Sequence, residues 1–380
     1  MVKIVVTGDF CPAFKNSETI GFNAYKAIFG NFPDTIEGKD LHITNLECPL
    51  TSSTDRILKD GPSIKASVEM IEALKYARTD VACLANNHIL DFGTRGLLDT
   101  INLCDKNGIK TVGAGKNLAD ASQVLYLSVK NKTIAIVNIT QHEFSIALKD
   151  RAGANPLNPV QNFYSIREAR KNSSIVLVIV HGGNEEYPLP SERVVDTYRF
   201  FADIGASAVI SHHAHCISGF EVYNNVPIFY GLGNFIFELA GEEVPDNWYT
   251  GLMLLLSINS EDQIAFELKP FYQFKKGIGF KFLEGAEKNA IMEEINKYSE
   301  IIKDRNLLKQ HWNDFSERSR NYYYGGLNGF GPIRRKLFKF QIMQKWIFPL
   351  KKKIVLYDMI KCESHNDVIS ELLINDILGE

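Results

Sequence analysis

The sequence predicts an α/β fold, in which sheets are flanked by helices in layers and a mainly helical extension follows toward the C-terminus. Three observations support this prediction. Short apolar runs recur through the first two thirds of the chain, most are separated by segments long enough for a helix, and each ends in a polar cluster. Several runs are apolar without alternation, which is typical of strands that are covered on both faces.

The predicted strands are, in chain order, residues 3–7, 41–44, 81–84, 133–139, 175–180, 208–210 and 226–230. Two of the segments between them have apolar side chains at roughly helical spacing. These are residues 67–77, which read SVEMIEALKYA, and residues 94–107. Both segments are therefore predicted to be crossover helices.

The pattern changes in the last third of the chain. From about residue 284 onward, long mixed stretches have helical spacing, and the glycine-rich segment 324–331 interrupts them. We therefore place a boundary near residue 280, with one α/β domain over 1–280 and a helical, basic extension over 281–380.

Composition and charge restrict the classes of function. The chain has 45% hydrophobic and 23% charged residues, which is typical of a globular protein with a sizeable core. Its formal net charge of -3 provides no overall positive field, so we expect no nucleic-acid partner. The six cysteines form no C-x-x-C pair, which indicates a reducing compartment.

The N-terminal apolar run is too short for a signal-peptide core, because Gly8 and Asp9 interrupt it. No stretch approaches the roughly 20 apolar residues that a membrane-spanning helix needs. We therefore expect a cytoplasmic protein.

Polar side chains that can bind metals follow five of the predicted strands. In α/β folds, ligands bind in the loops at the carboxyl ends of strands, so these positions are the ones to examine. They are Gly8-Asp9, Asn45-Leu46-Glu47, Asn86-Asn87-His88 with Asp91, His181-Gly182-Gly183, and Ser211-His212-His213-Ala214-His215.

These clusters differ in how specific they are. Asp9 alone is most simply a turn or cap residue, and His181 alone a buried histidine with satisfied hydrogen bonds. The H-H-x-H cluster at 212–215 is specific by itself, because packing does not explain three imidazoles in four residues. Together the loops supply two carboxylates, an amide and several histidines, a set suited to two divalent ions that share a bridging carboxylate.

Seven motifs in one order carry a resemblance to a known family. The sequence resembles the bacterial capsule-synthesis family, whose best-known members act in poly-gamma-glutamate production and which is a branch of the calcineurin-like metallophosphoesterases. The resemblance spans roughly residues 3–240 and implies a layered, metallophosphoesterase-like sandwich. The motifs are GDF (8–10), NLECPL (45–50), ANNHILDFG (85–93), VGAGKN (112–117), HGGNE (181–185), SHHAH (211–215) and YGLGNF (230–235).

The resemblance also implies a role for each candidate residue. Asp9 and His215 would hold one metal ion, whereas Asn87, His181 and His213 would hold the other. Glu47 would bridge the two ions in place of the superfamily's usual aspartate. His88 would lie beside the ions and either donate a proton to the leaving group or stabilise charge on the transferred group, and Asp91 could orient it.

The first motif departs from the superfamily, which has an Asp-x-His pair where this chain has Asp9-Phe10-Cys11. Cys11 could replace the histidine as a thiolate ligand, because residues i and i+2 of an extended segment face the same side. The alternative is that Cys11 is a small buried hydrophobic residue.

The predicted function is hydrolysis of a phosphoester in capsule or exopolymer biosynthesis, by water activated between two ions of manganese, iron or zinc. The substrate would be a phosphorylated or polymer-related molecule, which no residue pattern identifies. An alternative is a non-catalytic accessory protein of exopolymer synthesis or export that keeps the metal site. A third is an α/β binding domain without cofactor, in which the histidine cluster is structural.

A basic, aromatic stretch occupies residues 334–353, where the charged residues are all lysine or arginine. Such a stretch could lie on the anionic inner face of the membrane, which would make the protein peripheral there. The alternative is a packed helix with a solvated basic face, broken by Pro349.

Overall fold

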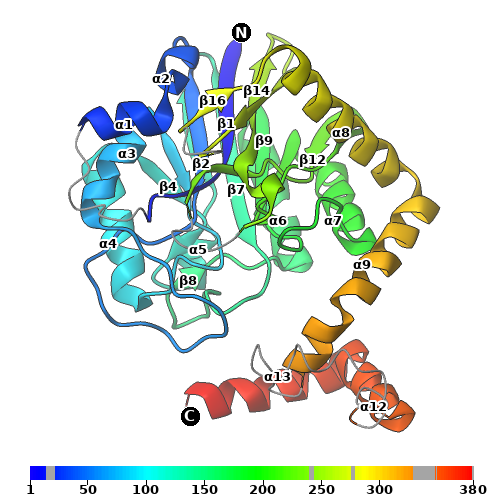
Figure 1. Cartoon of the computed structure of the whole chain (residues 1–380). Helices are drawn as coiled ribbons and strands as arrows, with labels where there is room; N and C mark the ends of the chain where they lie inside the picture. The colour runs from blue at the N-terminus through cyan, green and yellow to red at the C-terminus, as the bar shows by residue number, and fades with distance from the viewer. Residues whose placement is uncertain (14–21, 239–243, 275–278, 328–346, 348, 379–380) are drawn as a thin grey trace. The chain divides into compact units, whose positions relative to one another are not determined.

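The computed structural model describes residues 1–380 except 14–21, 239–243, 275–278, 328–346, 348 and 379–380 (Figure 1). Residue contacts divide the chain into two compact units, Met1–Leu308 and Lys309–Glu380. The first unit contains the sheets, and the second is helical.

The larger sheet of the first unit has eight strands, with β1 near its centre. The strands β1 to β4 are parallel, β13 pairs in parallel with the end of β1, and β14 to β16 add an antiparallel edge. In spatial order they are β16 (Lys281–Phe282), β15 (Ile264–Tyr272), β14 (Thr250–Ile258), β1 (Val2–Cys11), β2 (Leu41–Leu46), β3 (Val81–Cys83) and β4 (Lys110–Val112), with β13 (Asn234–Phe237) beside β1.

The second sheet has six strands, of which the central β7, β9, β10 and β12 are parallel. Its order is β11 (Phe220–Tyr223), β12 (Val226–Phe229), β10 (Ala208–His212), β9 (Ile175–His181), β7 (Lys132–Thr140) and β6 (Leu125–Val129). A two-stranded sheet pairs β5 (Ala114–Gly115) with β8 (Gly153–Ala154).

The two large sheets pack face to face, and alternation along the strands sets the core. In β1, Ile4 and Val6 belong to a hydrophobic cluster shared with Ile136 and Ile179 of the other sheet. Val5, between them, faces a second cluster formed with helices. Because both faces of β1 are covered, its sequence is apolar without alternation.

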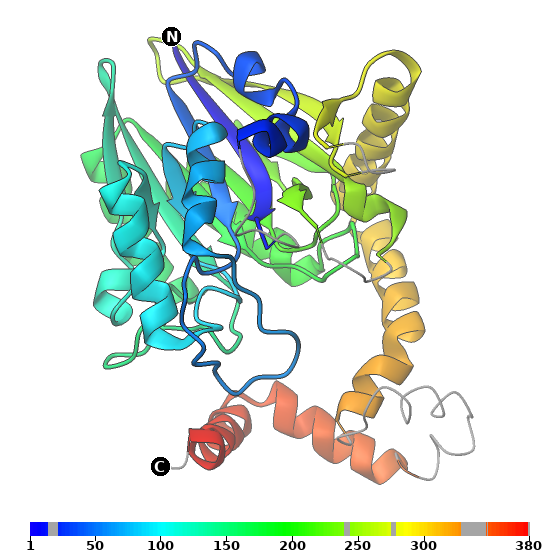
Figure 2. The same ribbon diagram turned by 60° about the vertical axis from the view of Figure 1, so that its left-hand side comes forward.

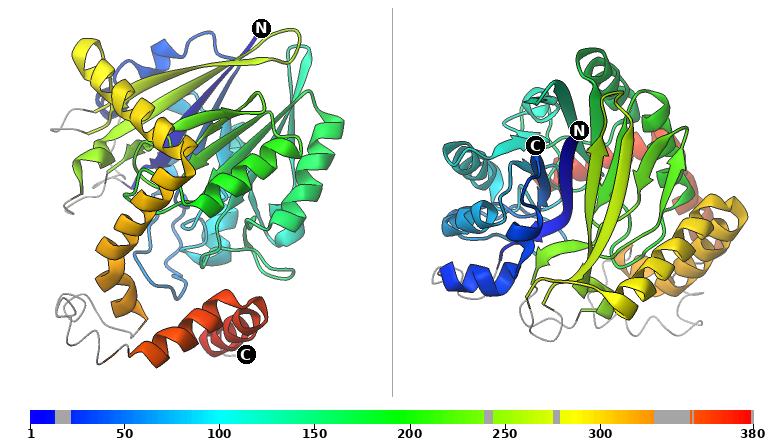
Figure 3. Two further views of the ribbon diagram at one scale, coloured as in Figure 1. Left: turned by 90° about the vertical axis from the view of Figure 1, so that its right-hand side faces the viewer. Right: turned by 90° about the horizontal axis from the view of Figure 1, so that it is seen from above.

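Helices cover the outer faces of both sheets, as the view from above shows (Figure 3, right). The helices between the strands are α1 (Phe22–Phe29), α2 (Phe32–Thr35), the 3-10 turn η2 (Val68–Met70), α3 (Ile71–Tyr76), α4 (Gly93–Lys106), α5 (Leu118–Ala121), α6 (Pro159–Asn172), α7 (Glu192–Asp203) and the 3-10 turn η3 (Asp246–Tyr249). The fold is thus the α/β sandwich that the sequence predicts.

The predicted elements are confirmed where the pattern was clear. Every predicted strand is present, and residues 67–77 and 94–107 contain η2 with α3 and α4. The antiparallel pair β14 and β15 was not predicted. It follows the last predicted strand, so the sheet is mixed rather than wholly parallel.

The first unit continues beyond residue 280, where the sequence placed a boundary. Helix α8 (Gly285–Lys303) buries Ile295 and Ile302, and Ser299 Oγ accepts a hydrogen bond of 2.9 Å from the backbone N–H of Phe220 in β11. This helix therefore packs on the sandwich.

The second unit consists of helices in the described residues. They are most of α9 (Arg305–Gly326), α12 (Leu350–Lys361) and α13 (Glu363–Leu378). The basic stretch 334–353 lies for the most part outside the described residues. Among those that are described, no helix has the length and apolar character needed to cross a membrane.

Candidate metal centre

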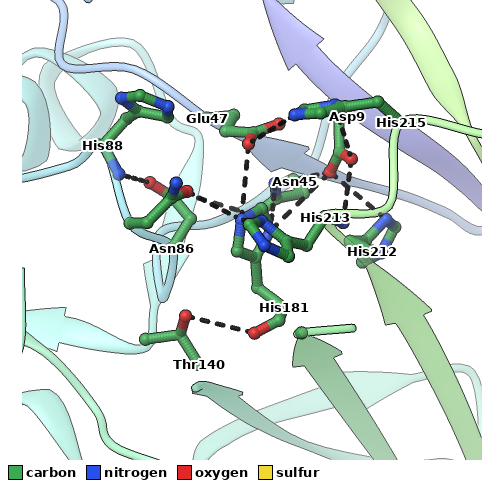
Figure 4. Close-up of polar contacts among 12 residues, drawn as sticks. Asp9, Asn45, Glu47, Asn86, His88, Thr140, His181, His212, His213 and His215 are labelled. Carbon is green, nitrogen blue, oxygen red and sulfur yellow. Dashed lines mark hydrogen bonds and ion pairs between the residues drawn. The ribbon is translucent and has the colours of Figure 1, made fainter. Parts of the chain in front are cut away.

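The candidate ligands of both sheets meet at the carboxyl ends of the parallel strands. Asp9 lies on β1 and Glu47 directly follows β2, whereas His181 ends β9 and the loop with His213 and His215 follows β10. Parallel strands end at the same edge of a sheet, and the sheets face each other, so these loops converge. Figure 4 shows their side chains pointing toward one another.

One group of donor atoms surrounds His181. Its Nε2 lies 2.9 Å from Asn87 Oδ1, 3.1 Å from His213 Nδ1 and 3.3 Å from Glu47 Oε1. Glu47, His181 and His213 each offer a ligand atom within 4.8 Å of the others, and all three are buried. Four donor atoms from four separate loops therefore face one small volume.

A second group contains Asp9, Glu47 and His215, again with ligand atoms within 4.8 Å of one another. His215 Nε2 lies 3.6 Å from Glu47 Oε1. The other ring nitrogen, Nδ1, lies 2.9 Å from Asn234 Oδ1 and donates a hydrogen bond to it. This hydrogen bond leaves Nε2 as the atom that can bind a metal, and Glu47 belongs to both groups.

The backbone between β10 and β11 adopts an unusual conformation at two of the candidate ligands. His213 and His215 have φ angles of 92° and 52°, in the left-handed region that residues other than glycine rarely adopt. The backbone N–H of His213 donates a 3.0 Å hydrogen bond to Asp9 Oδ2. Backbone strain of this kind occurs at functional sites, where the surrounding structure holds it in place.

Burial shifts the pKa values of these side chains toward their neutral forms. It raises the pKa of Asp9 to about 7, and it raises the pKa of Glu47 well above its usual value, with a further contribution from Asp9. Burial lowers the pKa of His213 to about 3 and that of His215 to about 4, and holds the pKa of His181 well below its usual value. The cluster thus contains acidic groups without a cation of its own.

A divalent cation fits this set of residues. Glu47 is fully buried, and neither of its carboxylate oxygens has a hydrogen-bond partner in the described part of the chain. A buried carboxylate without a partner is costly unless a cation or a proton compensates its charge. Mixed carboxylate, amide and imidazole donors are ligands for such cations, so these buried residues could hold metal ions.

His88 and Asp91 belong to neither group of ligands but are hydrogen-bonded to each other. His88 Nδ1 lies 2.7 Å from Asp91 Oδ2, and both side chains are buried. Lys59 Nζ donates a 2.5 Å hydrogen bond to Asp91 Oδ1. The pairing of His88 with Asp91 was predicted from the sequence, whereas Lys59, which stands in no motif, was not.

Further polar side chains support the candidate ligands, although the sequence analysis gave them no role. Asn45 Nδ2 donates to Asp9 Oδ1 at 2.7 Å, and Gln141 Nε2 lies 3.0 Å from His213 Nε2. His212 is buried, and neither of its ring nitrogens has a hydrogen-bond partner among the described residues; its Nδ1 lies 3.6 Å from Asp9 Oδ1. Asn45 and His212 stand in loops that the sequence pattern singles out, without an assigned ligand role, whereas Gln141 has no such signal.

Cys11 belongs to neither group of candidate ligands among the described residues. Its side chain belongs to the hydrophobic cluster under the helices, beside Cys48, and burial raises the pKa of its thiol. The expectation that it faces the same side as Asp9 required regular alternation. The pairing of β1 with β13 shifts register between Asp9 and Phe10, so that alternation is broken. Cys11 is thus the buried hydrophobic residue of the two alternatives.

Two facing sheets flanked by helices, with buried carboxylates and imidazoles at their strand ends, define a layered α/β protein with a candidate metal centre. The family model described as "Bacterial capsule synthesis protein PGA_cap" matches residues 3–239. The chain therefore belongs to this family of bacterial capsule synthesis proteins, which confirms the resemblance.

Individual relatives have names of the same kind. The chain is 33% identical over 225 residues to "PGA biosynthesis protein CapA" of Bacillus subtilis, covering 58% of this chain and 59% of that protein. It is 33% identical over 253 residues to "Capsule biosynthesis protein CapA" of Bacillus anthracis, covering 64% and 62%. A "Probable polyglutamine synthesis accessory protein" of Mycobacterium tuberculosis is 29% identical over 230 residues, covering 57% and 60%. The chain thus spans about three fifths of the length of these curated relatives.

Among solved structures, a "novel phosphatase" of Mycoplasma pneumoniae superposes with a TM-score of 0.46 and 14% identity, covering 71% of this chain and 93% of that one.

Proposed function

We propose that this protein is a metal-dependent hydrolase that cleaves a phosphoester in the biosynthesis of a capsule or related exopolymer. The observation that carries the proposal is the position of Glu47. Its carboxylate is shared by two groups of buried ligand atoms, and both of its oxygens lack a hydrogen-bond partner in the described residues. The names of the relatives support the capsule context.

The ligand groups suggest how two divalent ions would be held. Asp9, Glu47 and His215 would bind one ion, whereas Glu47, Asn87, His181 and His213 would bind the other. Manganese, iron and zinc all suit this mixture of oxygen and nitrogen donors. When bound, such ions would supply Lewis acidity toward a phosphoryl oxygen and lower the pKa of a water molecule that can attack the phosphorus atom.

His88 would protonate the leaving group. An ionised Asp91 carboxylate only accepts hydrogen bonds, so His88 Nδ1 carries the proton that joins the two side chains. In the described residues no hydrogen bond occupies His88 Nε2, so this nitrogen can face a substrate. In its acid form the ring would carry a second proton on Nε2 and pass that proton to the leaving oxygen, which leaves the neutral ring protonated at Nδ1. Asp91 would act by orienting the ring rather than by touching the substrate.

The proposal is tested by metal analysis combined with a phosphoester screen. Purified protein should contain about two ions per chain, and it should hydrolyse phosphodiesters or phosphomonoesters after reconstitution with manganese, iron or zinc. Asp9→Ala should abolish turnover. His88→Ala should lower the rate about 100-fold or more while leaving the metal content unchanged, since general acids contribute about 10²- to 10⁴-fold.

The outcomes separate an enzyme from a binding protein. Full metal content without turnover on any phosphoester would favour the non-catalytic accessory protein, which the name of the Mycobacterium tuberculosis relative describes. A His213→Ala/His215→Ala protein that binds as much metal as the wild type would contradict the ligand assignment itself. The loops around the ions would determine which phosphoester is the natural substrate.

A further inference from the structure

The long connection between β2 and η2 makes three hydrogen bonds to one residue, Asp91. This loop, residues 51–65, projects beyond the carboxyl ends of the strands (Figure 2). The backbone N–H of Ile57 donates to the carbonyl oxygen of Asp91 at 3.1 Å, and that of Ile64 donates to its carboxylate Oδ2 at 2.7 Å. Lys59 donates to the other carboxylate oxygen at 2.5 Å. Asp91 therefore joins the loop to His88.

Lys59 is unusual because its charged end is hidden. Its side chain is only 5% exposed, and that of Asp91 is fully buried. Lysine is almost never buried without a partner, because removing an ammonium group from water is costly. An exposed lysine could contact solvent or substrate freely, whereas this one is committed to the Asp91 carboxylate.

The contacts of Lys59 determine how Asp91 can meet His88. Lys59 Nζ lies 3.3 Å from His88 Nδ1, and both atoms donate hydrogen bonds to the same carboxylate. Lys59 occupies Oδ1, and Ile64 N–H together with His88 occupies Oδ2. With both oxygens engaged, the carboxylate cannot rotate freely, and the imidazole is held with Nε2 on its opposite edge.

We propose that Lys59 is a positioning residue for proton donation: it fixes the Asp91 carboxylate so that His88 Nε2 points at the oxygen of the leaving group. The inference rests on the proposed hydrolase function and extends it to the loop 51–65. Lys59 acts through Asp91 and His88 and does not bind the phosphoryl group. Its effect should therefore depend on how much the leaving group needs a proton.

The test compares leaving groups in the full-length, metal-loaded protein. A 4-nitrophenyl phosphoester leaves without protonation, whereas an alkyl phosphoester needs it. Lys59→Met should slow the alkyl substrate at least ten times more than the nitrophenyl substrate, with unchanged metal content. Lys65→Met is the matched control, because Lys65 lies in the same loop but donates to the carbonyl oxygen of Ser53. This control should affect both substrates equally, and Lys59→Arg should restore most of the alkyl rate.

A second measurement does not depend on activity. Nitrogen-15 NMR of the histidine rings reports on the neutral ring, the form left after the Nε2 proton has been donated. With His88 assigned from His88→Gln, the neutral ring should be a single tautomer protonated at Nδ1 in the wild type and a mixture in Lys59→Met. Unchanged leaving-group ratios together with an unchanged His88 tautomer would overturn the inference and leave the hydrolase intact. If the wild type hydrolyses nothing, the hydrolase proposal fails, and the tautomer alone decides whether Lys59 positions His88.

Should Lys59→Met lose its thermal unfolding transition, Lys59→Gln replaces it in both measurements. Glutamine can still donate one hydrogen bond to Asp91, so the expected tautomer mixture and leaving-group effect have the same direction but smaller size. An unchanged tautomer in Lys59→Gln would contradict the inference in the same way.

Discussion

The sandwich and the C-terminal helices differ in which kinds of side chain they bury. In the sandwich, carboxylates, imidazoles and amides are buried completely, at the ends of strands whose apolar residues are also buried. In α12 and α13, large apolar side chains are exposed instead. Ile354, Tyr357 and Ile360 of α12 are 60%, 67% and 57% exposed, and Leu372 of α13 is 59% exposed.

The difference shows that hydrophobicity and burial are separate properties of a segment. Residues 354–360 read IVLYDMI, so apolar side chains surround α12 on nearly every side. A helix with this composition is usually enclosed by protein or lipid. The described residues do not enclose it, whereas in the sandwich even charged residues are enclosed. Stability of the sandwich should therefore depend on its buried polar groups and little on α12.

The largest expected effect is a difference in the free energy of unfolding between variants of two buried glutamates of the sandwich. Glu221 accepts hydrogen bonds from Arg199 at 2.9 and 2.6 Å and from Tyr230 at 2.6 Å, whereas Glu47 accepts none in the described residues. In metal-free protein at pH 7, Glu221→Gln should lower the free energy of unfolding by about 3 kcal/mol, because it removes one partner of a buried ion pair. Glu47→Gln should raise it by about 1 kcal/mol while abolishing binding of both metals.

Urea unfolding with a chelator, together with metal analysis, measures both effects. The sign for Glu47 follows from its raised pKa: at pH 7, folding of the metal-free chain must protonate or desolvate this carboxylate, and glutamine removes that cost. A loss of stability in Glu47→Gln as large as that in Glu221→Gln would show that Glu47 has a partner in solution, which removes the main support for the metal site.

A smaller effect concerns His42, a buried histidine that belongs to neither candidate ligand group. Its Nε2 lies 3.0 Å from Thr7 Oγ1 and its Nδ1 3.0 Å from the carbonyl oxygen of Ala77. Burial lowers the pKa of His42 to about 3. The unfolded chain therefore binds a proton that the folded chain does not between about pH 6.5 and pH 3, so this contribution is present at pH 7 and is lost as the pH falls.

The size of the His42 effect is about 1.4 kcal/mol per pH unit across this window. His42→Gln should unfold more easily at pH 7, but its stability should fall less steeply than that of the wild type between pH 6 and pH 4. Urea titrations of metal-free protein at these pH values give both slopes. Equal slopes would mean that His42 keeps its ordinary pKa in the folded protein.

Much of the site could be predicted because its ligands follow a local rule. Asp9, Glu47, His181 and the histidines after β10 all stand where a buried strand ends, and a sequence shows strand ends directly. Their grouping around Glu47 follows from the family resemblance, since no local pattern assigns residues of different strands to one ion.

The remaining residues depend on contacts that no local pattern contains. Lys59 reaches Asp91 from an irregular loop, and Gln141 reaches His213 from the end of a different strand. Cys11 was ambiguous because a register shift in β1 cannot be read from alternation. The strand β14 does carry an apolar run, LMLLL at 252–256, so its existence could have been predicted; the sheet edge at which β14 pairs with β1 could not.

The smallest expected effect is the change in the free energy of unfolding when an exposed apolar residue of the C-terminal helices is replaced. Ile354 in α12 is 60% exposed, whereas Ile295 in α8 is fully buried against the sandwich. Ile354→Ser should change the free energy of unfolding of the sandwich by less than about 0.5 kcal/mol, as exposed substitutions usually do. Ile295→Ser, the matched control in another helix, should lower it by about 3 kcal/mol or more, because it removes buried apolar atoms and buries a hydroxyl group.

Urea unfolding of the two full-length variants, followed by tryptophan fluorescence, makes the measurement. A loss of more than about 1 kcal/mol in Ile354→Ser would show that something covers α12 in solution. Repeating the experiment with anionic vesicles then identifies what covers α12. If stability is lost only with vesicles present, lipid covers the helix, as the basic stretch 334–353 suggests. If it appears without vesicles and depends on protein concentration, a second copy of the chain covers the helix. Exposure in α12 would then mark an interface rather than a segment without a role.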